Sequence, residues 1–263
     1  MQYTGICIIK NGSIEPLDEQ EPIGDDNEVY EVLRIFSGKA LFLPDHTERW
    51  INSMKATGRE IPQWVDKLPQ LIDWLIACNG IKDCDMRITA SANGTIQCGF
   101  VETDFPSEAQ YANGVECQLL QAERATPSLK IFHSAMRHDA ATQQAETGAY
   151  ESILVNGQGE ITEGSRSNVY FVDQQGVIHT APDGTVLGGI MRKKVLSVCH
   201  DLGITIKFEC VKASDIKSYV AAFLSSTPMR VLPINKIGDT SFDFGNIVVR
   251  KVVDGVNDLV KKQ

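Results

Sequence analysis

The stretch EITEGSRSNVYF (Glu160–Phe171) is the most informative part of the chain. An acidic residue, Glu163, precedes a turn rich in glycine, serine and asparagine, and an apolar, strand-like run starts at Asn168. By residue type alone, such a turn is most often a loop whose Ser167 and Asn168 side chains hydrogen-bond the local backbone. The alternative is a functional site at the edge of a strand, and both interpretations stay open at this point.

Two further segments on the C-terminal side also allow both a structural and a functional interpretation. VLGGIMR (Val186–Arg192) places two glycines before a predicted helix, and free N–H groups at a helix N-terminus attract anions such as phosphate. LSSTPM (Leu224–Met229) is rich in hydroxyl groups at the end of a predicted strand. A plain glycine turn and an ordinary polar loop are the simpler explanations of the two segments.

The arrangement of periodic segments predicts an α+β protein with two domains. Strands do not alternate regularly with long helices, which argues against a doubly wound parallel sheet. The polar stretch AERATPS, residues 122–128, contains a proline and reads as a linker between domains at 1–121 and 129–263. Apolar periodicity places helices at 63–77 and 190–202. A closing glycine, Gly148, marks a helix at 134–147, and a last helix is expected at 244–260. Strands are expected at 3–9, 29–36, 86–90, 95–101, 115–121, 152–155, 168–172, 177–180, 204–210 and 220–225.

Composition excludes several classes of function. The 263 residues carry a net charge of −9, which argues against a general binder of nucleic acids or anionic membranes. No apolar run reaches the roughly 18 residues of a membrane span, and the N-terminus does not resemble a secretory signal. Seven scattered cysteines without a C-x-x-C pair argue against a disulfide framework or a zinc site and favour the cytoplasm. The nearby His133, His138 and Asp139 match no standard metal spacing, so no metal is expected.

Four blocks of the sequence, in this order, resemble the class IV (fold type IV) pyridoxal-phosphate enzymes. This family includes branched-chain aminotransferases, D-amino acid aminotransferases and aminodeoxychorismate lyase. The blocks are VYEVLRIFSG (residues 29–38) with HTER (46–49), EGSRSN (163–168), LGGIMR (187–192), and SST (225–227) with PI (233–234). The resemblance covers nearly the whole chain and implies a cofactor cleft between a smaller N-terminal and a larger C-terminal domain.

The resemblance implies a role for each matching residue. The family's lysine lies about eighteen residues before the glycine that ends the next helix; counting back from Gly148 leads to Lys130, which would form the Schiff base with pyridoxal 5'-phosphate and move the substrate proton. Glu163 would pair with the pyridine nitrogen, and Tyr30 would line the substrate side. The remaining cofactor-binding residues implied by the resemblance are Arg49, Ser167, Asn168, Gly189, Ile190, Met191 and Thr227.

Three functions stay open. The first is an aminotransferase acting on an amino acid and a 2-oxo acid; the second is aminodeoxychorismate lyase, which releases pyruvate and 4-aminobenzoate. The third is a catalytically inactive relative that acts as a binding or structural protein. Met191 in place of the family's threonine and Pro228 after Thr227 motivate this alternative. The resemblance also implies a homodimer.

Overall fold

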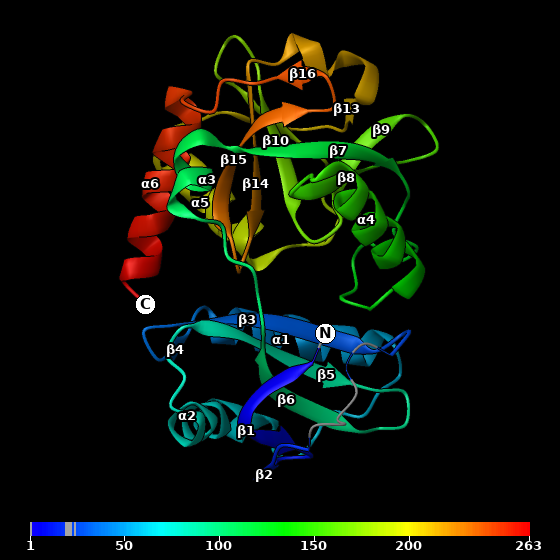
Figure 1. Cartoon of the computed structure of the whole chain (residues 1–263), viewed down its shortest axis with the longest axis vertical. Helices are drawn as coiled ribbons and strands as arrows, with labels where there is room; N and C mark the ends of the chain where they lie inside the picture. The colour runs from blue at the N-terminus through cyan, green and yellow to red at the C-terminus, as the bar shows by residue number, and fades with distance from the viewer. Residues whose placement is uncertain (1, 19–22, 24) are drawn as a thin grey trace. The chain divides into compact units, whose positions relative to one another are not determined.

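The computed structural model describes residues 2–18, 23 and 25–263, and the chain divides into two compact units (Figure 1). Unit 1 comprises residues 1–104, 129–134 and 263, and unit 2 comprises residues 105–128 and 135–262. Each unit combines a sheet with helices, as the predicted α+β class requires.

Unit 1 is a six-stranded antiparallel sheet with helices on one face. The strand order is β2-β1-β6-β5-β3-β4, and every neighbouring pair is antiparallel. The strands are β1 (Tyr3–Lys10), β2 (Ser13–Pro16), β3 (Val29–Phe36), β4 (Lys39–Ala40), β5 (Cys84–Ala90) and β6 (Ile96–Val101). The helices are α1 (Leu43–Ala56) and α2 (Leu68–Asn79), the latter preceded by a 3-10 turn at Val65–Lys67.

Side-chain alternation along β3 and β5 separates two faces of this sheet. Leu33 and Met86 lie on the face that packs with Trp50 of α1 and Leu75 of α2, and all four side chains are fully buried. The intervening residues of β3 and β5 point to the opposite face. Two kinds of environment therefore exist on one sheet, an apolar core under the helices and a second face on which polar side chains gather.

Unit 2 is built on a mixed sheet with the order β12-β11-β10-β14-β15-β7-β8-β9-β13, to which β16 adds beside β15. Three pairs are parallel, namely β7 with β8, β7 with β15 and β11 with β12. The strands are β7 (Val115–Gln121), β8 (Glu151–Val155), β9 (Glu160–Gly164), β10 (Asn168–Val172), β11 (Ile178–Thr180), β12 (Ile206–Phe208), β13 (Val211–Lys212), β14 (Ala221–Ser226), β15 (Arg230–Ile237) and β16 (Thr240–Ser241). The helices are α3 (Glu108–Asn113), α4 (Ser134–Thr147), α5 (Ile190–Asp201) and α6 (Ile247–Lys261), with a 3-10 helix at Ala213–Ser218.

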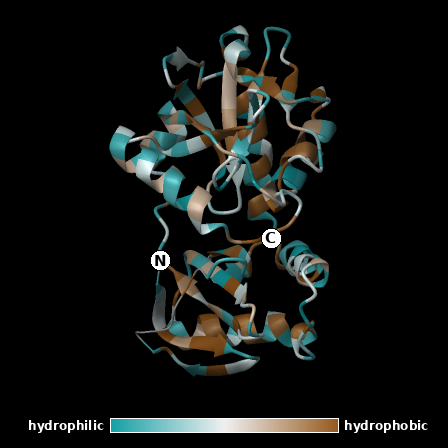
Figure 2. Cartoon of the chain, turned by 90° about the vertical axis from the view of Figure 1, so that its right-hand side faces the viewer, coloured by the Kyte–Doolittle hydropathy of each residue, from teal (hydrophilic) through white to brown (hydrophobic). Residues whose placement is uncertain are grey.

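The hydrophobic residues of unit 2 concentrate on the strands (Figure 2), and the helix α6 buries one apolar stripe. The stripe of α6 consists of Val249, Val252, Val256 and Val260, spaced three or four residues apart and buried. Asn246 caps this helix, since its side chain accepts a hydrogen bond from the N–H of Val248 at 3.0 Å. The sequence pattern of the C-terminal helix therefore matches its observed packing.

The units differ from the predicted domains in two places. β7, residues 115–121, was expected to close the first domain, but it pairs with β8 and β15 and so belongs to unit 2. Residues 129–134 were expected to open the second domain, but they pair with the start of β3 and belong to unit 1. The boundary therefore follows hydrogen-bonded strand pairing and not the polar composition of residues 122–128.

Most predicted elements are present, with instructive exceptions. The helix predicted from residue 63 begins at Leu68, because Pro69 lacks an amide hydrogen and fits the first helical turn. β15 was not predicted; Pro233 within it is unusual in an inner strand, yet it stands opposite Phe223 in the pairing with β14. The strand β9 was also not predicted.

The cysteines also depart from the expectation. The structure joins Cys7 of β1 to Cys78 of α2 in a disulfide, although the scattered spacing argued against disulfides. The other five cysteines are free. Within the described part of the chain, no helix combines the length and hydrophobicity that crossing a membrane requires.

Candidate active site

Lys130 lies on a short extended segment beside the first residues of β3. The N–H of Tyr30 donates to the carbonyl of Lys130 at 3.0 Å, and the N–H of Phe132 donates to the carbonyl of Glu28 at 3.0 Å. The N–H of Lys130 donates to Ser53 Oγ of α1 at 3.3 Å. These contacts place the Lys130 amine 4.9 Å from the centre of the Tyr30 ring. Two predicted site residues that are far apart in the sequence are thus neighbours within unit 1.

A buried charge network lies next to this pair. Arg49 grips Glu31 with both ends of its guanidinium fork, Nε to Oε1 and Nη2 to Oε2, each at 2.7 Å. His46 Nδ1 lies 2.7 Å from Glu31 Oε2. Glu31 is completely buried, because it occupies the helix-facing side of β3 opposite α1, which carries both His46 and Arg49. Arg49 was predicted as a phosphate ligand, whereas Glu31 was not predicted, although it stands beside Tyr30 in the first family block.

The network determines the charge states of its members. Burial alone raises the pKa of Glu31, but the charge of Arg49 and hydrogen bonds from Arg49 and His46 outweigh it and lower the pKa to about 2. Burial lowers the pKa of His46, and the Glu31 carboxylate does not fully compensate. Burial also acts to lower the pKa of Arg49, but the Glu31 charge more than offsets it and raises that pKa. At neutral pH the network is therefore a Glu31–Arg49 ion pair beside a neutral imidazole.

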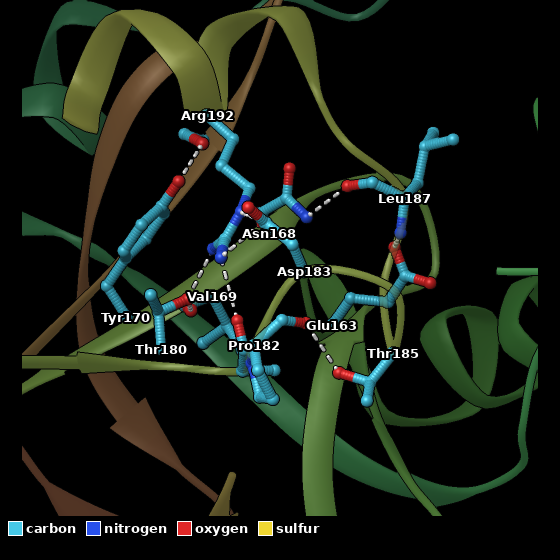
Figure 3. A network of polar contacts seen from close by, with 12 residues as sticks. Glu163, Asn168, Val169, Tyr170, Thr180, Pro182, Asp183, Thr185, Leu187 and Arg192 are labelled. Carbon is cyan, nitrogen blue, oxygen red and sulfur yellow. Dashed lines mark hydrogen bonds and ion pairs between the residues drawn. The ribbon is translucent and has the colours of Figure 1, made fainter. Parts of the chain in front are cut away.

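Glu163 is the corresponding buried carboxylate of unit 2. It stands on β9, is 3% exposed, and accepts a hydrogen bond from Arg124 Nε on Oε1 at 3.0 Å. Its Oε2 accepts the N–H of Leu187 at 3.3 Å (Figure 3). A carboxylate offers about four lone-pair positions, so Glu163 retains capacity for one more donor, such as a protonated ring nitrogen. Arg124 was not predicted, because nothing in the polar stretch around it signals a buried ion pair.

The predicted anion site at the start of α5 is closely connected to Glu163. Asn168 Nδ2 donates to the carbonyl of Leu187 at 3.0 Å, so Asn168 and Glu163 hold the two sides of one residue (Figure 3). Gly189 forms the N-cap of α5 and offers no side chain to the helix donors. A methyl group on Gly189 would overlap the Asn168 amide. Because helix geometry leaves the N–H groups of Ile190 and Met191 without intrahelical acceptors, this end of α5 suits an anion.

Buried Arg192 ties the first turn of α5 to the end of β11 and the residue after it. Its Nη1 donates to Thr180 Oγ1 at 2.8 Å, and its Nη2 donates to the carbonyl of Ala181 at 2.7 Å (Figure 3). Met191, which replaces the family's threonine, turns its side chain into the interior and is 1% exposed. Only the backbone of Met191 is therefore available to an anion. Arg192 belongs to the third family block, but no role was predicted for it.

Ser167 has a different environment from the one predicted. Its hydroxyl donates to Glu151 Oε2 at 2.8 Å, and the hydroxyl of Ser165 donates to Glu151 Oε1 at 2.6 Å. Glu151 is completely buried on β8 and also accepts the N–H of Ser152 at 2.9 Å. Glu151 therefore fixes the turn between Glu163 and Asn168, and the Ser167 hydroxyl bonds this distant carboxylate instead of the local backbone.

Thr227 is buried in the turn that joins β14 to β15. The predicted residues thus fall into two groups. Tyr30, Arg49 and Lys130 gather in unit 1, whereas Glu163, Asn168, Gly189, Ile190 and Met191 gather in unit 2 around Leu187. Among the described residues, no cluster of three or more histidine, cysteine or acidic side chains could hold a metal ion.

Both groups suit parts of pyridoxal 5'-phosphate. In unit 1, a primary amine beside an aromatic ring suits the aldehyde of the cofactor. In unit 2, a buried carboxylate with spare acceptor capacity suits the ring nitrogen, and a helix N-terminus capped by glycine suits the phosphate. Each group by itself therefore matches a different part of the same molecule.

Comparison with known proteins gives a consistent result. Residues 28–237 match the family model described as amino-transferase class IV. A probable branched-chain-amino-acid aminotransferase of Rickettsia felis is 26% identical over 250 residues, covering 89% of this chain and 84% of that protein. A D-alanine aminotransferase of Bacillus licheniformis is 29% identical over 234 residues, covering 82% of this chain and 81% of that protein.

A solved structure shows the same fold. The branched-chain aminotransferase of the archaeon Thermoproteus uzoniensis, solved with norvaline, superposes with a TM-score of 0.83 at 20% identity, covering 99% of this chain and 96% of that chain. The predicted fold type IV architecture is therefore confirmed. The family match spans well over half of the sequence, and the chain belongs to the class IV aminotransferases.

Proposed function

We propose that this aminotransferase uses pyridoxal 5'-phosphate, that Lys130 binds the cofactor covalently, and that the enzyme moves an amino group between an amino acid and a 2-oxo acid. The observation that carries the proposal is the position of the Lys130 amine, 4.9 Å from the Tyr30 ring on a segment held by β3 and α1. A lysine at the end of an unstructured linker would have no such fixed surroundings. A branched-chain amino acid aminotransferase of the same fold, solved with pyridoxamine 5'-phosphate, supports the choice of cofactor.

The residues of unit 1 would do the proton chemistry. When bound, the cofactor supplies an electron-accepting ring that stabilises the charge left at the substrate Cα. The Lys130 amine, once exchanged for the substrate's amine, would carry the proton to and from that Cα. Tyr30 would line the substrate side, next to the amine. Arg49 would contribute positive charge toward the phosphate while Glu31 fixes its orientation.

The residues of unit 2 would hold the ring and the phosphate. Glu163 would accept a hydrogen bond from the protonated ring nitrogen and keep that nitrogen charged, while Arg124 remains the ion-pair partner of Glu163. The N–H groups of Ile190 and Met191 would donate to phosphate oxygens, whereas the N–H of Gly189 already donates to the carbonyl of Leu187 at 2.7 Å. The hydroxyl of Thr227 would complete this set of phosphate donors.

Asn168 and Ser167 would act less directly than the resemblance implies. Asn168 holds the Leu187 carbonyl and so fixes the turn before α5. Ser167 is engaged by buried Glu151. We propose both as residues that keep the cofactor-binding turn in place.

Covalent trapping tests the assignment of Lys130. The purified protein is mixed with pyridoxal 5'-phosphate, reduced with borohydride and digested, and the modified peptide is identified by mass spectrometry. We expect the label on Lys130, its loss in Lys130→Ala, and its retention in Lys55→Ala, which removes an exposed lysine of α1 in the same unit. A label spread over surface lysines would contradict the proposal and favour an inactive relative.

A single half-reaction separates the aminotransferase from the lyase. With an amino acid and no 2-oxo acid, an aminotransferase converts its cofactor to the pyridoxamine form, which changes the absorption spectrum. A lyase returns the aldehyde form and releases pyruvate from aminodeoxychorismate. We expect the first result, because the curated relatives are named as aminotransferases.

We further propose a homodimer and a cytoplasmic location. The dimer is supported by the resemblance to the family. The location is supported by the five free cysteines, whereas the Cys7–Cys78 disulfide weighs against it. Sedimentation velocity and cell fractionation test these two statements. A monomer at micromolar concentration, or recovery in a secreted fraction, would contradict them.

A further inference from the structure

A second buried ion pair lies near Lys130 and has no part in the chemistry proposed so far. Glu28, just before β3, accepts a hydrogen bond from Arg87 Nη2 in the middle of β5. Glu28 is 3% exposed and Arg87 is 2% exposed. Two opposite charges are therefore withdrawn from water together, and each neutralises the other.

This pair is adjacent to the reactive amine. The Arg87 guanidinium lies 4.3 Å from the centre of the Tyr30 ring and 5.2 Å from that of Phe132. The Lys130 amine lies 4.9 Å from the same Tyr30 ring, so the two cationic groups are within about 9 Å of each other.

The pair lies on the face of the sheet that points away from α1 and α2. Arg87 stands opposite Val32, and Tyr30 stands opposite Thr89, in the β3–β5 register. Their neighbours Leu33 and Met86 point the other way, into the core under α1 and α2. Arg87 and Tyr30 therefore face away from the helices, with Phe132 beside them.

An arginine in this position would normally attract an anionic group of the substrate. Its planar fork matches a carboxylate, and both partners gain strength in a dry environment. Glu28 supplies such a carboxylate from the chain itself. A substrate with a second carboxylate would have to displace Glu28 or place its charge next to it, and either event is unfavourable.

We propose that Glu28 is a specificity-determining residue: by occupying Arg87, it disfavours amino acids and 2-oxo acids with a second carboxylate and leaves the site to uncharged side chains. This inference rests on the proposed function, because it takes Lys130 as the point at which the substrate reacts. It concerns the side chain of the substrate and not the carboxylate that all amino acids share.

Two achiral 2-oxo acids of equal chain length provide the test. 2-Oxoglutarate and 2-oxopentanoate differ only in the second carboxylate, so their relative kcat/KM as amino acceptors reports its effect. Glu28→Gln keeps the size of the side chain but removes its charge. We expect the ratio of kcat/KM for 2-oxoglutarate over 2-oxopentanoate to rise at least tenfold, in line with a hydrogen bond to a charged group.

A binding measurement accompanies the kinetics. In a thermal-shift assay of the cofactor-loaded protein, 2-oxoglutarate should raise the Tm of Glu28→Gln more than it raises that of the wild type. 2-Oxopentanoate should shift both proteins equally. Turnover of either oxo acid by the wild type tests the proposed function, whereas only the ratio and the differential Tm shift test the role of Glu28.

Matched variants isolate the Arg87 charge. In the double variant Glu28→Gln with Arg87→Gln, the rise in the kcat/KM ratio should disappear, because the Arg87 guanidinium that Glu28→Gln leaves unoccupied is also removed. Asp85→Asn removes another buried carboxylate from the same face of β5 and should leave the ratio unchanged. If Glu28→Gln does not fold, Glu28→Asp retains the charge but withdraws it by one methylene, and a smaller rise is expected.

Two results would overturn the proposal. One is an unchanged ratio in Glu28→Gln or, in its place, Glu28→Asp; if both kcat/KM values rise equally, Arg87 binds the carboxylate that the two oxo acids share. The other is a gain that persists in the double variant, which would place the effect elsewhere than Arg87.

Discussion

Replacing Glu31 with glutamine tests the buried charge network beside Lys130. Glu31 holds two nitrogens of Arg49 and one of His46 at 2.7 Å each, without exposure to water. Its pKa falls from an ordinary 4.5 to about 2. At about 1.4 kcal/mol for each pKa unit, the ionised form contributes about 3 kcal/mol to the stability of unit 1 at pH 7. This figure agrees with the roughly 3–5 kcal/mol that breaking a buried ion pair costs.

The pH dependence follows from the direction of the shift. Because the folded-state pKa lies below the unfolded one, the stabilisation is present above pH 4.5 and is lost as the pH falls toward about 2. Glutamine cannot titrate. The difference in the free energy of unfolding between the wild type and Glu31→Gln should therefore be about 3 kcal/mol at pH 7 and shrink progressively between about pH 4.5 and pH 2.

Urea denaturation followed by tryptophan fluorescence measures this difference. The three tryptophans, Trp50, Trp64 and Trp74, all lie in unit 1, so the signal reports the unit that contains Glu31. Glu48→Gln, which removes an exposed carboxylate of α1, serves as the control and should change little. A loss below about 1 kcal/mol at pH 7, the size of an exposed pair, or a loss that stays constant down to pH 3, would refute the reasoning.

Three further changes test unit 2. Arg124→Gln should lower the free energy of unfolding by about 3 kcal/mol, because it leaves buried Glu163 without its counter-ion; unchanged urea midpoints would contradict this. Gly189→Ala should push against the Asn168 amide and weaken the binding of pyridoxal 5'-phosphate about tenfold or more, measured by absorption titration against Gly188→Ala, where a methyl group has open space. Glu151→Gln should cost about 2 kcal/mol, since two hydroxyls and an N–H lose a charged acceptor, and a wild-type thermal midpoint would count against that role.

The sequence predicted those parts of the site that local pattern and motif determine. The glycines before an apolar helix predict a helix start there, and Gly189 is the N-cap of α5; the anion site at this end stays a proposal. The helix at 134–147 followed from its closing glycine, Gly148. Such features depend on neighbouring residues, which a sequence shows directly.

The partners of buried charges could not be predicted in the same way. Arg124 and Glu163 are 39 residues apart, and Glu28 and Arg87 are 59 residues apart. Only the strand pairing brings them together, and hydrophobic periodicity carries no information about which acid meets which base. For Ser167 the sequence motif was recognised, but the partner of its hydroxyl was not predicted: the hydroxyl donates to Glu151.

Lys130 belongs to unit 1, although the polar stretch before it suggested a place in the second domain. Its segment returns to unit 1 and forms backbone hydrogen bonds with the start of β3. Ile131 fixes this return, because its side chain joins the core under α1 and α2 and pairs with Val29. The Lys130 amine, the ring of Tyr30 and the Glu28–Arg87 pair thus lie together beside β3 and β5 in unit 1. Substitutions on that sheet should alter the choice of substrate, whereas those around Glu163 should alter the hold on the cofactor.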